Sequence, residues 1–159
     1  SFYTQFQEAN IQHIEVADYS QSSIETAVKL LNYSTDVPIT RVYICHGILH
    51  SNTVKPEKRI EDLDPSSFIE VLTANALIPI LWIKALTNII TGKFECRVTV
   101  FSARVGSISD NNLGGWYSYR ASKAALNMLL KTVSIEFARR SKNIKVISRT
   151  LLTSQFEIS

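Results

Sequence analysis

The feature that most constrains the fold is an alternation of strand-like and helix-like segments along the chain. Apolar or alternating runs typical of β-strands occupy residues 11–16, 41–45, 96–101 and 144–147. Stretches with apolar residues at helical spacing occupy residues 22–31, 65–90 and 117–140. Strands joined by helices of this length form a parallel sheet with helices on both faces. The sequence therefore predicts an α/β fold, and nothing in its 159 residues marks a domain boundary.

Capping residues mark the starts of two of these helices. Ser22 and Glu25 have the spacing of a capping box. Asp64 followed by Pro65 combines a carboxylate cap with the residue best suited to the first helical position. Pro79 lies inside the second helix and has no N–H to donate, so we expect a kink or a broken hydrogen bond there.

The residues that carry chemistry are Tyr119 and Lys123, four apart at the start of the last helix, so their side chains share one face. A phenol has a pKa of about 10, and a neighbouring ammonium favours the phenolate and lowers that pKa. Such a tyrosine can give a proton to a carbonyl oxygen or take one from an alcohol. The pair is therefore a candidate for acid–base catalysis.

Two longer segments resemble the short-chain dehydrogenase/reductase family. GGWYSYRASKAALNMLLKTVSIEFARR, preceded by a strand and the loop FSARVGSI, resembles the family's active-site segment. PEKRIEDLDPSSFIEVLTANALIP resembles the fourth helix of its carbonyl-reductase branch, to which the sniffer and C-factor proteins are related. The resemblance runs from about residue 11 to residue 156. It implies a Rossmann-like, doubly wound parallel sheet and a nicotinamide cofactor, NAD(P).

The resemblance also implies roles for individual residues. Tyr119 would be the general acid or base, and Lys123 would lower its pKa and bind the ribose hydroxyls of the nicotinamide. Asn75 would anchor a water molecule in the proton relay to Lys123. The family's catalytic serine position holds Ala103 here, and Ser107, twelve residues before Tyr119, is the replacement candidate. A hydroxyl that only caps the loop is an equally good reading of Ser107.

The chain departs from the family where the cofactor should bind. The family opens with a strand and a glycine-rich turn that holds the pyrophosphate, and no such pattern occurs here. Of the turn after the fourth strand only Gly47 remains, and Asp18 lies one place after the position of the adenine-contacting acid. We therefore expect an incomplete sheet that lacks the first βαβ unit, with residues 1–159 as one partial dinucleotide-binding domain and with an exposed edge at 41–45.

These features favour an NAD(P)-dependent oxidoreductase that interconverts a carbonyl compound and an alcohol by hydride transfer. The expected site comprises Tyr119, Lys123, Asn75 and Ser107, with Tyr119, Lys123, Gly47 and Asp18 on the cofactor. The alternative is a non-catalytic relative, either a degenerate copy or a signalling and interaction protein, which the missing glycine-rich turn favours. The substrate and the choice between NAD and NADP are not encoded in these residues.

Composition restricts the possible partners. The net charge is +3 with scattered basic residues, which argues against a nucleic-acid groove. The apolar run from Ala76 to Ile83 is too short to span a bilayer, and two cysteines cannot form a disulfide framework, so we expect a cytoplasmic protein. His46 and His50 lack a third ligand nearby, so no metal site is expected. The resemblance implies a homo-oligomer formed through the helices at 66–90 and 117–140.

Overall fold

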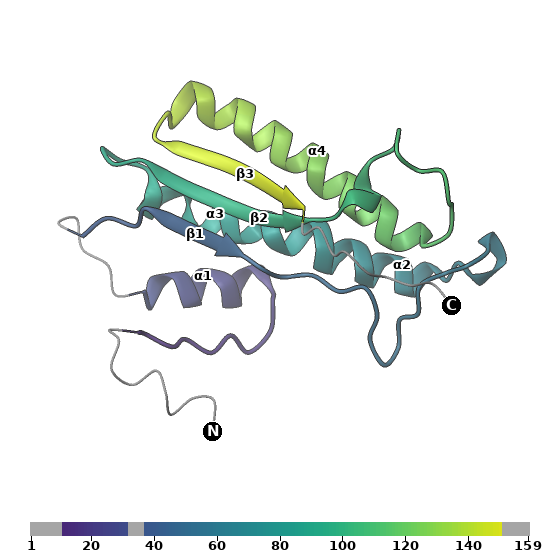
Figure 1. Cartoon of the computed structure of the whole chain (residues 1–159). Coiled ribbons are helices and arrows are strands. Elements are labelled where there is room, and N and C mark those ends of the chain that lie inside the picture. Colours follow the sequence, from purple (N-terminus) through teal and green to yellow (C-terminus); the bar gives the residue numbers. More distant parts are fainter. Residues whose placement is uncertain (1–10, 32–36, 151–159) are drawn as a thin grey trace.

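The computed structural model describes residues 11–31 and 37–150 of the chain. Their centre is a three-stranded parallel sheet in the order β1-β2-β3, with the three strands pointing the same way (Figure 1). The strands are β1 Arg41–Ile44, β2 Cys96–Ser102 and β3 Ile144–Thr150. The parallel sheet predicted from the alternation of elements is confirmed, and β1 is the exposed edge strand.

The helices are α1 Gln21–Lys29, α2 Pro65–Leu72, α3 Ile78–Ile90 and α4 Tyr117–Arg140. Each helix lies in a segment with helical periodicity, so the sequence placed all of them. Asp64 caps α2 as predicted, because its carboxylate accepts the backbone N–H of Ser67 at 2.8 Å. At α1 the predicted capping box is wrong: the helix begins two residues earlier, and the cap is Ser20, which accepts the N–H of Ser23 at 3.3 Å. Several serines stand in a row there, and the first of them takes the capping role.

The hydrophobic core lies on one face of the sheet. Alternate residues of β1, β2 and β3 join a cluster with side chains from α1, α3 and α4, and this cluster includes Ile44, Val98, Val100, Ile83 and Leu126. The opposite face carries residues that are exposed or half-buried, among them Arg41, Tyr43, Arg97, Phe101, Lys145 and Arg149. Helices on both faces were predicted, but within the described residues they cover one face only. The other face is covered in a doubly wound fold by helices of other βαβ units.

Residues 11–16 do not form the predicted strand. In the structure this segment has no strand pairing, and the side chain of Gln12 donates to the carbonyl of Leu30 at 2.7 Å. An alternating pattern marks a chain suited to a sheet, but a strand also needs a neighbour for its backbone hydrogen bonds. Without one among the described residues, the segment runs along α1 instead.

The long helical region at 65–90 is continuous but irregular in its middle. Thr73–Leu77 form a π-helical turn between α2 and α3, and Pro79 is the second residue of α3. The carbonyl of Asn75 would ordinarily bond the N–H of residue 79, which proline lacks, so the wider turn agrees with the broken bond predicted there. By length and composition Pro65–Ile90 could cross a membrane, yet Ile83, Leu86 and Ile90 within it pack into the core.

Candidate functional site

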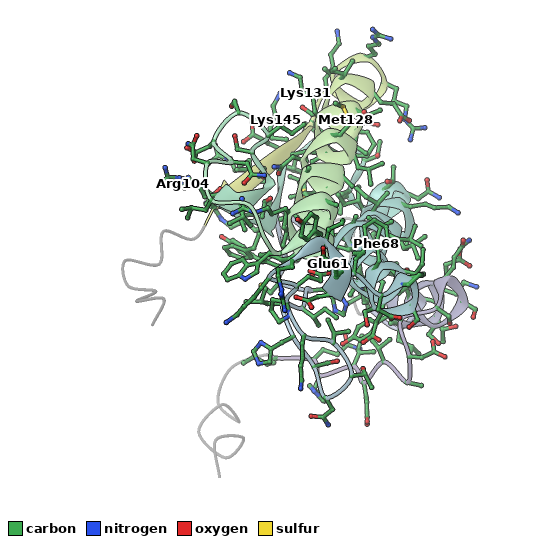
Figure 2. All side chains as sticks on the ribbon, turned by 90° about the vertical axis from the view of Figure 1, so that its right-hand side faces the viewer. Glu61, Phe68, Arg104, Met128, Lys131 and Lys145 are labelled. Atoms are coloured by element: carbon green, nitrogen blue, oxygen red, sulfur yellow. The ribbon has the colours of Figure 1, made fainter. Side chains whose placement is uncertain are left out.

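The candidate site lies at the carboxyl ends of β1 and β2, where the loops after these strands meet the first turns of α4. Figure 2 views the molecule from this end, with Arg104 in the loop after β2 on one side and Glu61 and Phe68 on the other. Parallel strands bring their carboxyl ends together at one edge of the sheet, and open α/β sheets bind ligands there. The predicted Tyr119, Lys123, Asn75 and Gly47 all belong to this edge.

Tyr119 and Lys123 lie one turn apart on α4, as their spacing predicts. The ammonium nitrogen of Lys123 is 5.7 Å from the centre of the Tyr119 ring. Lys123 is buried, with 5% of its surface exposed, and its ammonium lies 3.4 Å from the carbonyl oxygen of Phe101 at the end of β2. The lysine therefore reaches from the helix across to the sheet and passes beside the phenol.

Burial affects the protonation of both members of this pair. Burial raises the pKa of Tyr119 above its ordinary value, and burial lowers the pKa of Lys123. At 5.7 Å from the ring, the ammonium does not outweigh the loss of water around the phenol. Burial thus dominates the Tyr119 pKa in this structure, which holds the phenol as the neutral acid. The prediction that Lys123 lowers this pKa stays a prediction.

Asn75 is fully buried and joins the loop after β1 to α4. Its amide accepts the backbone N–H of Ile48 at 2.7 Å and donates to the carbonyl of the same residue at 2.8 Å. It also donates to the hydroxyl of Ser122 at 3.0 Å, and this hydroxyl donates to the carbonyl of Tyr119 at 2.8 Å. The side chain of Asn75 is thus occupied by protein groups and fixes the backbone at Tyr119. The predicted anchoring of a water molecule by Asn75 stays a prediction.

Gly47 is held against the same two side chains. A Cβ atom at this position would lie 2.9 Å from the amide oxygen of Asn75 and 3.3 Å from the ammonium of Lys123. Only a glycine lets the loop approach so closely. The one glycine kept from the family's turn is therefore needed for packing within the site.

The serine candidate, Ser107, lies in the loop after β2, and a second serine, Ser102, ends the strand itself. Ser102 is buried and donates its hydroxyl to the side chain of Asn127 at 2.7 Å, which directs it along α4 away from the first turn. Ser107 follows a 3₁₀ turn at Arg104–Gly106, and its hydroxyl lies 3.3 Å from that of Ser109. Gly106 packs directly on the backbone of Lys123. This contact brings the chain just before Ser107 to the helix, and the role of Ser107 stays a prediction.

Asp18 and His46 mark the other end of the site. The ring of Tyr19 contacts that of His46 in a tilted arrangement, with the ring centres 4.2 Å apart, which places the residue after Asp18 at the end of β1. Burial, and secondly repulsion from the ammonium of Lys123, lower the pKa of His46. Hydrogen bonds from Ser20 and Ser23 lower the pKa of Asp18 to about 2. Its carboxylate already serves the start of α1, and a cofactor contact by Asp18 stays a prediction.

One site residue was missed by the sequence analysis. Glu57 is 5% exposed, and its carboxylate accepts hydrogen bonds from the backbone N–H and the hydroxyl of Ser118, directly before Tyr119. Its backbone carbonyl accepts the N–H of Trp116 at 2.6 Å. Glu57 and Ser118 are sixty-one positions apart in the sequence, and no local sequence signal points to their contact. Within the described residues no group of three His, Cys, Asp or Glu could hold a metal ion.

Comparison with characterised proteins agrees with this geometry. No protein-family profile matches the chain. C-signal of Myxococcus xanthus is 36% identical over 75 residues, 47% of this chain and 45% of that protein. A 1-hydroxy-2-glutathionyl-2-methyl-3-butene dehydrogenase of a Rhodococcus species is 32% identical over 110 residues, 69% of this chain and 45% of that enzyme. The chain therefore spans less than half the length of these relatives.

Solved structures give the fold. Carbonyl reductase Sniffer of D. melanogaster superposes with a TM-score of 0.74 at 21% identity, over 92% of this chain and 60% of that one. The chain has the short-chain dehydrogenase/reductase fold. A carbonyl reductase of Pseudomonas aeruginosa in complex with NADP gives a TM-score of 0.70 at 20% identity, over 89% of this chain and 57% of that one. The family resemblance inferred from the sequence is confirmed by these likenesses.

Within the short-chain dehydrogenase/reductase fold, the site described above falls at the edge where the resemblance placed it. The tyrosine and lysine lie one turn apart on α4, and the asparagine lies in the π-helical turn before α3. The fold therefore unites Tyr119, Lys123, Asn75 and Gly47. Gly106, next to Ser107, packs on Lys123, and Tyr19, next to Asp18, contacts His46, next to Gly47.

Proposed function

We propose that this chain carries the proton-transfer site of an NAD(P)-dependent oxidoreductase that acts on a small carbonyl compound or alcohol. The observation that carries the proposal is the pairing of a half-buried phenol with a buried ammonium 5.7 Å from its ring, at the carboxyl edge of a parallel sheet. Among the described residues Lys123 has no ion pair with a carboxylate, and a buried lysine without such a partner is costly to keep charged. The position of this buried lysine next to a tyrosine therefore indicates a catalytic role.

Tyr119 is the residue that moves the proton. Because burial raises its pKa, the phenol is protonated at neutral pH and can donate to a carbonyl oxygen as that oxygen becomes negative. The bound cofactor would supply the hydride for this reduction. Lys123 lies beside the ring, where its positive charge stabilises the phenolate that remains. In this form the site favours reduction of a carbonyl over oxidation of an alcohol.

The residues present fit one part of the cofactor. The ammonium of Lys123 has three N–H donors, and the carbonyl of Phe101 is the acceptor within 3.4 Å, which leaves donors for ribose hydroxyls. Gly47 keeps the space between Asn75 and Lys123 free of a side chain. The chain's five glycines do not form the family's pyrophosphate turn, so these residues would hold the nicotinamide ribose alone. NAD and NADP fit this description equally.

Two helices offer a surface for self-association. Ile69 and Leu77 in the region of α2 and α3, and Leu129 and Ile135 on α4, are large apolar side chains that are 38% to 59% exposed. Exposed apolar residues on neighbouring helices are typical of a subunit interface. We infer a homo-oligomer formed through these helices in a cytoplasmic protein, without nucleic acid or membrane as a partner.

A non-catalytic role is the second candidate. Only Gly47 remains of the family's turn after the fourth strand, and this departure favours a protein that keeps the fold without turning over a substrate. Such a protein would retain the hydrogen bonds of Asn75 and Glu57, because these stabilise the fold whether or not a cofactor binds. Cofactor binding therefore separates the two candidates.

The first test is a thermal melt of the chain with and without millimolar NADPH and NADH. A ligand at 100 times its Kd that binds only the folded state adds about 2.7 kcal/mol, which is roughly 5–10 °C for a domain of this size. We expect an upward shift with at least one of the two cofactors. A cooperative melt that neither cofactor shifts would favour the non-catalytic role.

The second test is Tyr119→Phe in a carbonyl-reduction assay that follows cofactor absorbance. Because this change removes the donated proton alone, we expect kcat to fall by about 10²–10⁴-fold. The cofactor-induced thermal shift should persist, since the ring and Lys123 remain. Tyr117→Phe is the matched control, because it makes the same chemical change at a tyrosine two residues before Tyr119. Equal rates for Tyr119→Phe and wild type would exclude the proposed role.

A further inference from the structure

We infer that Glu57 is a positioning residue for the catalytic turn, acting through Ser118 on Tyr119; this inference rests on the proposed function. The turn in question comprises Trp116 to Tyr119, where α4 begins. The first N–H groups of any helix have no partner within the helix, and a side chain at the N-cap usually supplies one. Here the N-cap residue is Trp116, and its side chain makes no capping bond.

Glu57 supplies the missing cap from elsewhere in the chain. Both of its carboxylate oxygens lie 3.3 Å from the backbone nitrogen of Ser118, the second residue of α4. One of them also accepts the hydroxyl of Ser118. A carboxylate at this end of a helix is stabilised by the helix dipole. The cap thus comes from a segment before α2, and it joins the two sides of the site.

The backbone of the same segment holds the residue before the helix. Trp116 has a left-handed conformation, with φ of 53°, which an ordinary side chain adopts only under constraint. The constraint includes the bond from its N–H to the carbonyl of Glu57 at 2.6 Å. The Trp116 ring then packs edge-on against the Tyr119 ring at 6.2 Å. Glu57 therefore fixes both the backbone entry to α4 and the ring beside the phenol.

Tyr119 is held from two directions as a result. On its far side the hydroxyl of Ser122 donates to the Tyr119 carbonyl, and Asn75 holds that hydroxyl. On its near side the carboxylate of Glu57 holds Ser118. These two sets of hydrogen bonds fix the backbone on both sides of Tyr119 and so restrict the position of its phenol. Rates of proton transfer respond to displacements on the order of 1 Å, which can cost about 10²-fold.

The test compares Glu57→Ala with Glu57→Gln and with Glu136→Ala as control. Glu136 is an exposed acid on the same helix, paired with Arg140 at 2.9 Å. Glutamine keeps an oxygen that can accept the N–H of Ser118, whereas alanine keeps none. All proteins are assayed below the onset of their thermal melts, so that the folded fraction is the same.

We expect Glu57→Ala to lower kcat for carbonyl reduction roughly ten- to a hundredfold, with the KM for the cofactor within about twofold of wild type, because Lys123 is untouched. Glu57→Gln should recover most of the lost kcat, and Glu136→Ala should match wild type. A lower melting temperature with unchanged kcat would show that Glu57 only stabilises the fold, which overturns the inference.

Amide hydrogen exchange gives a readout that needs no turnover. Exchange at Ser118 and Tyr119 should speed up in Glu57→Ala by more than at the far end of α4, and Glu57→Gln should restore it in part. If the wild-type chain reduces no carbonyl compound, the proposed function fails while exchange still reports whether Glu57 holds the turn. Unchanged exchange at Ser118 would refute the positioning role in either case.

Discussion

Gly106 offers a sharp test of how the loop after β2 is seated on α4. A Cβ atom at this glycine would lie 2.8 Å from both the carbonyl carbon and the Cβ of Lys123, and 2.9 Å from its carbonyl oxygen. Two of these three atoms are helix backbone, which cannot rotate away. The change Gly106→Ala therefore forces the loop away from α4 at Lys123. Gly92→Ala meets nothing within 4 Å and serves as the control.

The magnitude follows from the contact distances. Carbon atoms pack best at about 3.5–4.0 Å, so the added methyl must move by about 0.7 Å or more. Inserting one methyl into closely packed surroundings costs roughly 1–3 kcal/mol. Alanine also lowers the conformational entropy of the unfolded chain relative to glycine, which offsets this cost by about 0.4–1 kcal/mol. We expect a net loss of ~1–2 kcal/mol, which lowers the melting temperature by roughly 2–8 °C in a chain of this length.

The assay is thermal unfolding of wild type, Gly106→Ala and Gly92→Ala followed by circular dichroism. Gly114→Ala adds a second comparison, because Gly114 has open space around it but a φ of +66°. Its loss would come from backbone strain alone, about 1–2 kcal/mol. If Gly106→Ala melts at or above the temperature of Gly92→Ala, the loop does not press on Lys123 as described, and the reasoning fails.

Two further predictions concern the buried polar groups. Asn75→Ala removes the hydrogen-bond partners of Ile48 and Ser122, so we expect it to lower the free energy of unfolding in urea by ~2–4 kcal/mol. The control Asn88→Ala, at an exposed position, should change it little. Equal losses for the two variants would refute the stabilising role of the Asn75 hydrogen bonds. Because burial lowers the pKa of Lys123, its charge opposes folding at neutral pH, and this penalty disappears as pH rises through the lowered pKa toward 10.5. Lys123→Met should melt above wild type at pH 7, with the difference narrowing toward pH 10.5; a difference independent of pH would show that packing is its cause.

Much of the fold followed from the sequence because its signals are local. The helix predicted at 117–140 is Tyr117–Arg140, and the strand predicted at 96–101 is Cys96–Ser102. Helical periodicity over six turns and a β-branched run each determine a structure without reference to distant residues. The segment at 11–16 carried a strand pattern as well, but pairing needs a partner that local sequence does not encode.

The site was predictable in part for the same reason. Tyr119 and Lys123 share a helical face by their spacing, and the family resemblance placed Asn75 beside them. The direction of the Tyr119 pKa was not predictable, because it depends on how much water the fold removes from the phenol. Glu57 was missed because its contact with Ser118 spans sixty-one positions and follows no periodic pattern. Side-chain contacts between residues far apart in the sequence can be identified only from the structure.

The sheet face without helices has a consequence for how copies of the chain meet in solution. Arg41, Arg97 and Lys145 stand side by side across the three strands in register, and Arg149 lies farther along β3. Two such positively charged faces repel each other within about one Debye length, which is about 10 Å at 0.1 M salt and about 3 Å at 1 M. Tyr43 and Phe101 lie on the same face, and contact between them becomes possible once that repulsion is screened. A higher ionic strength therefore weakens the repulsion between two such faces and favours contact between them.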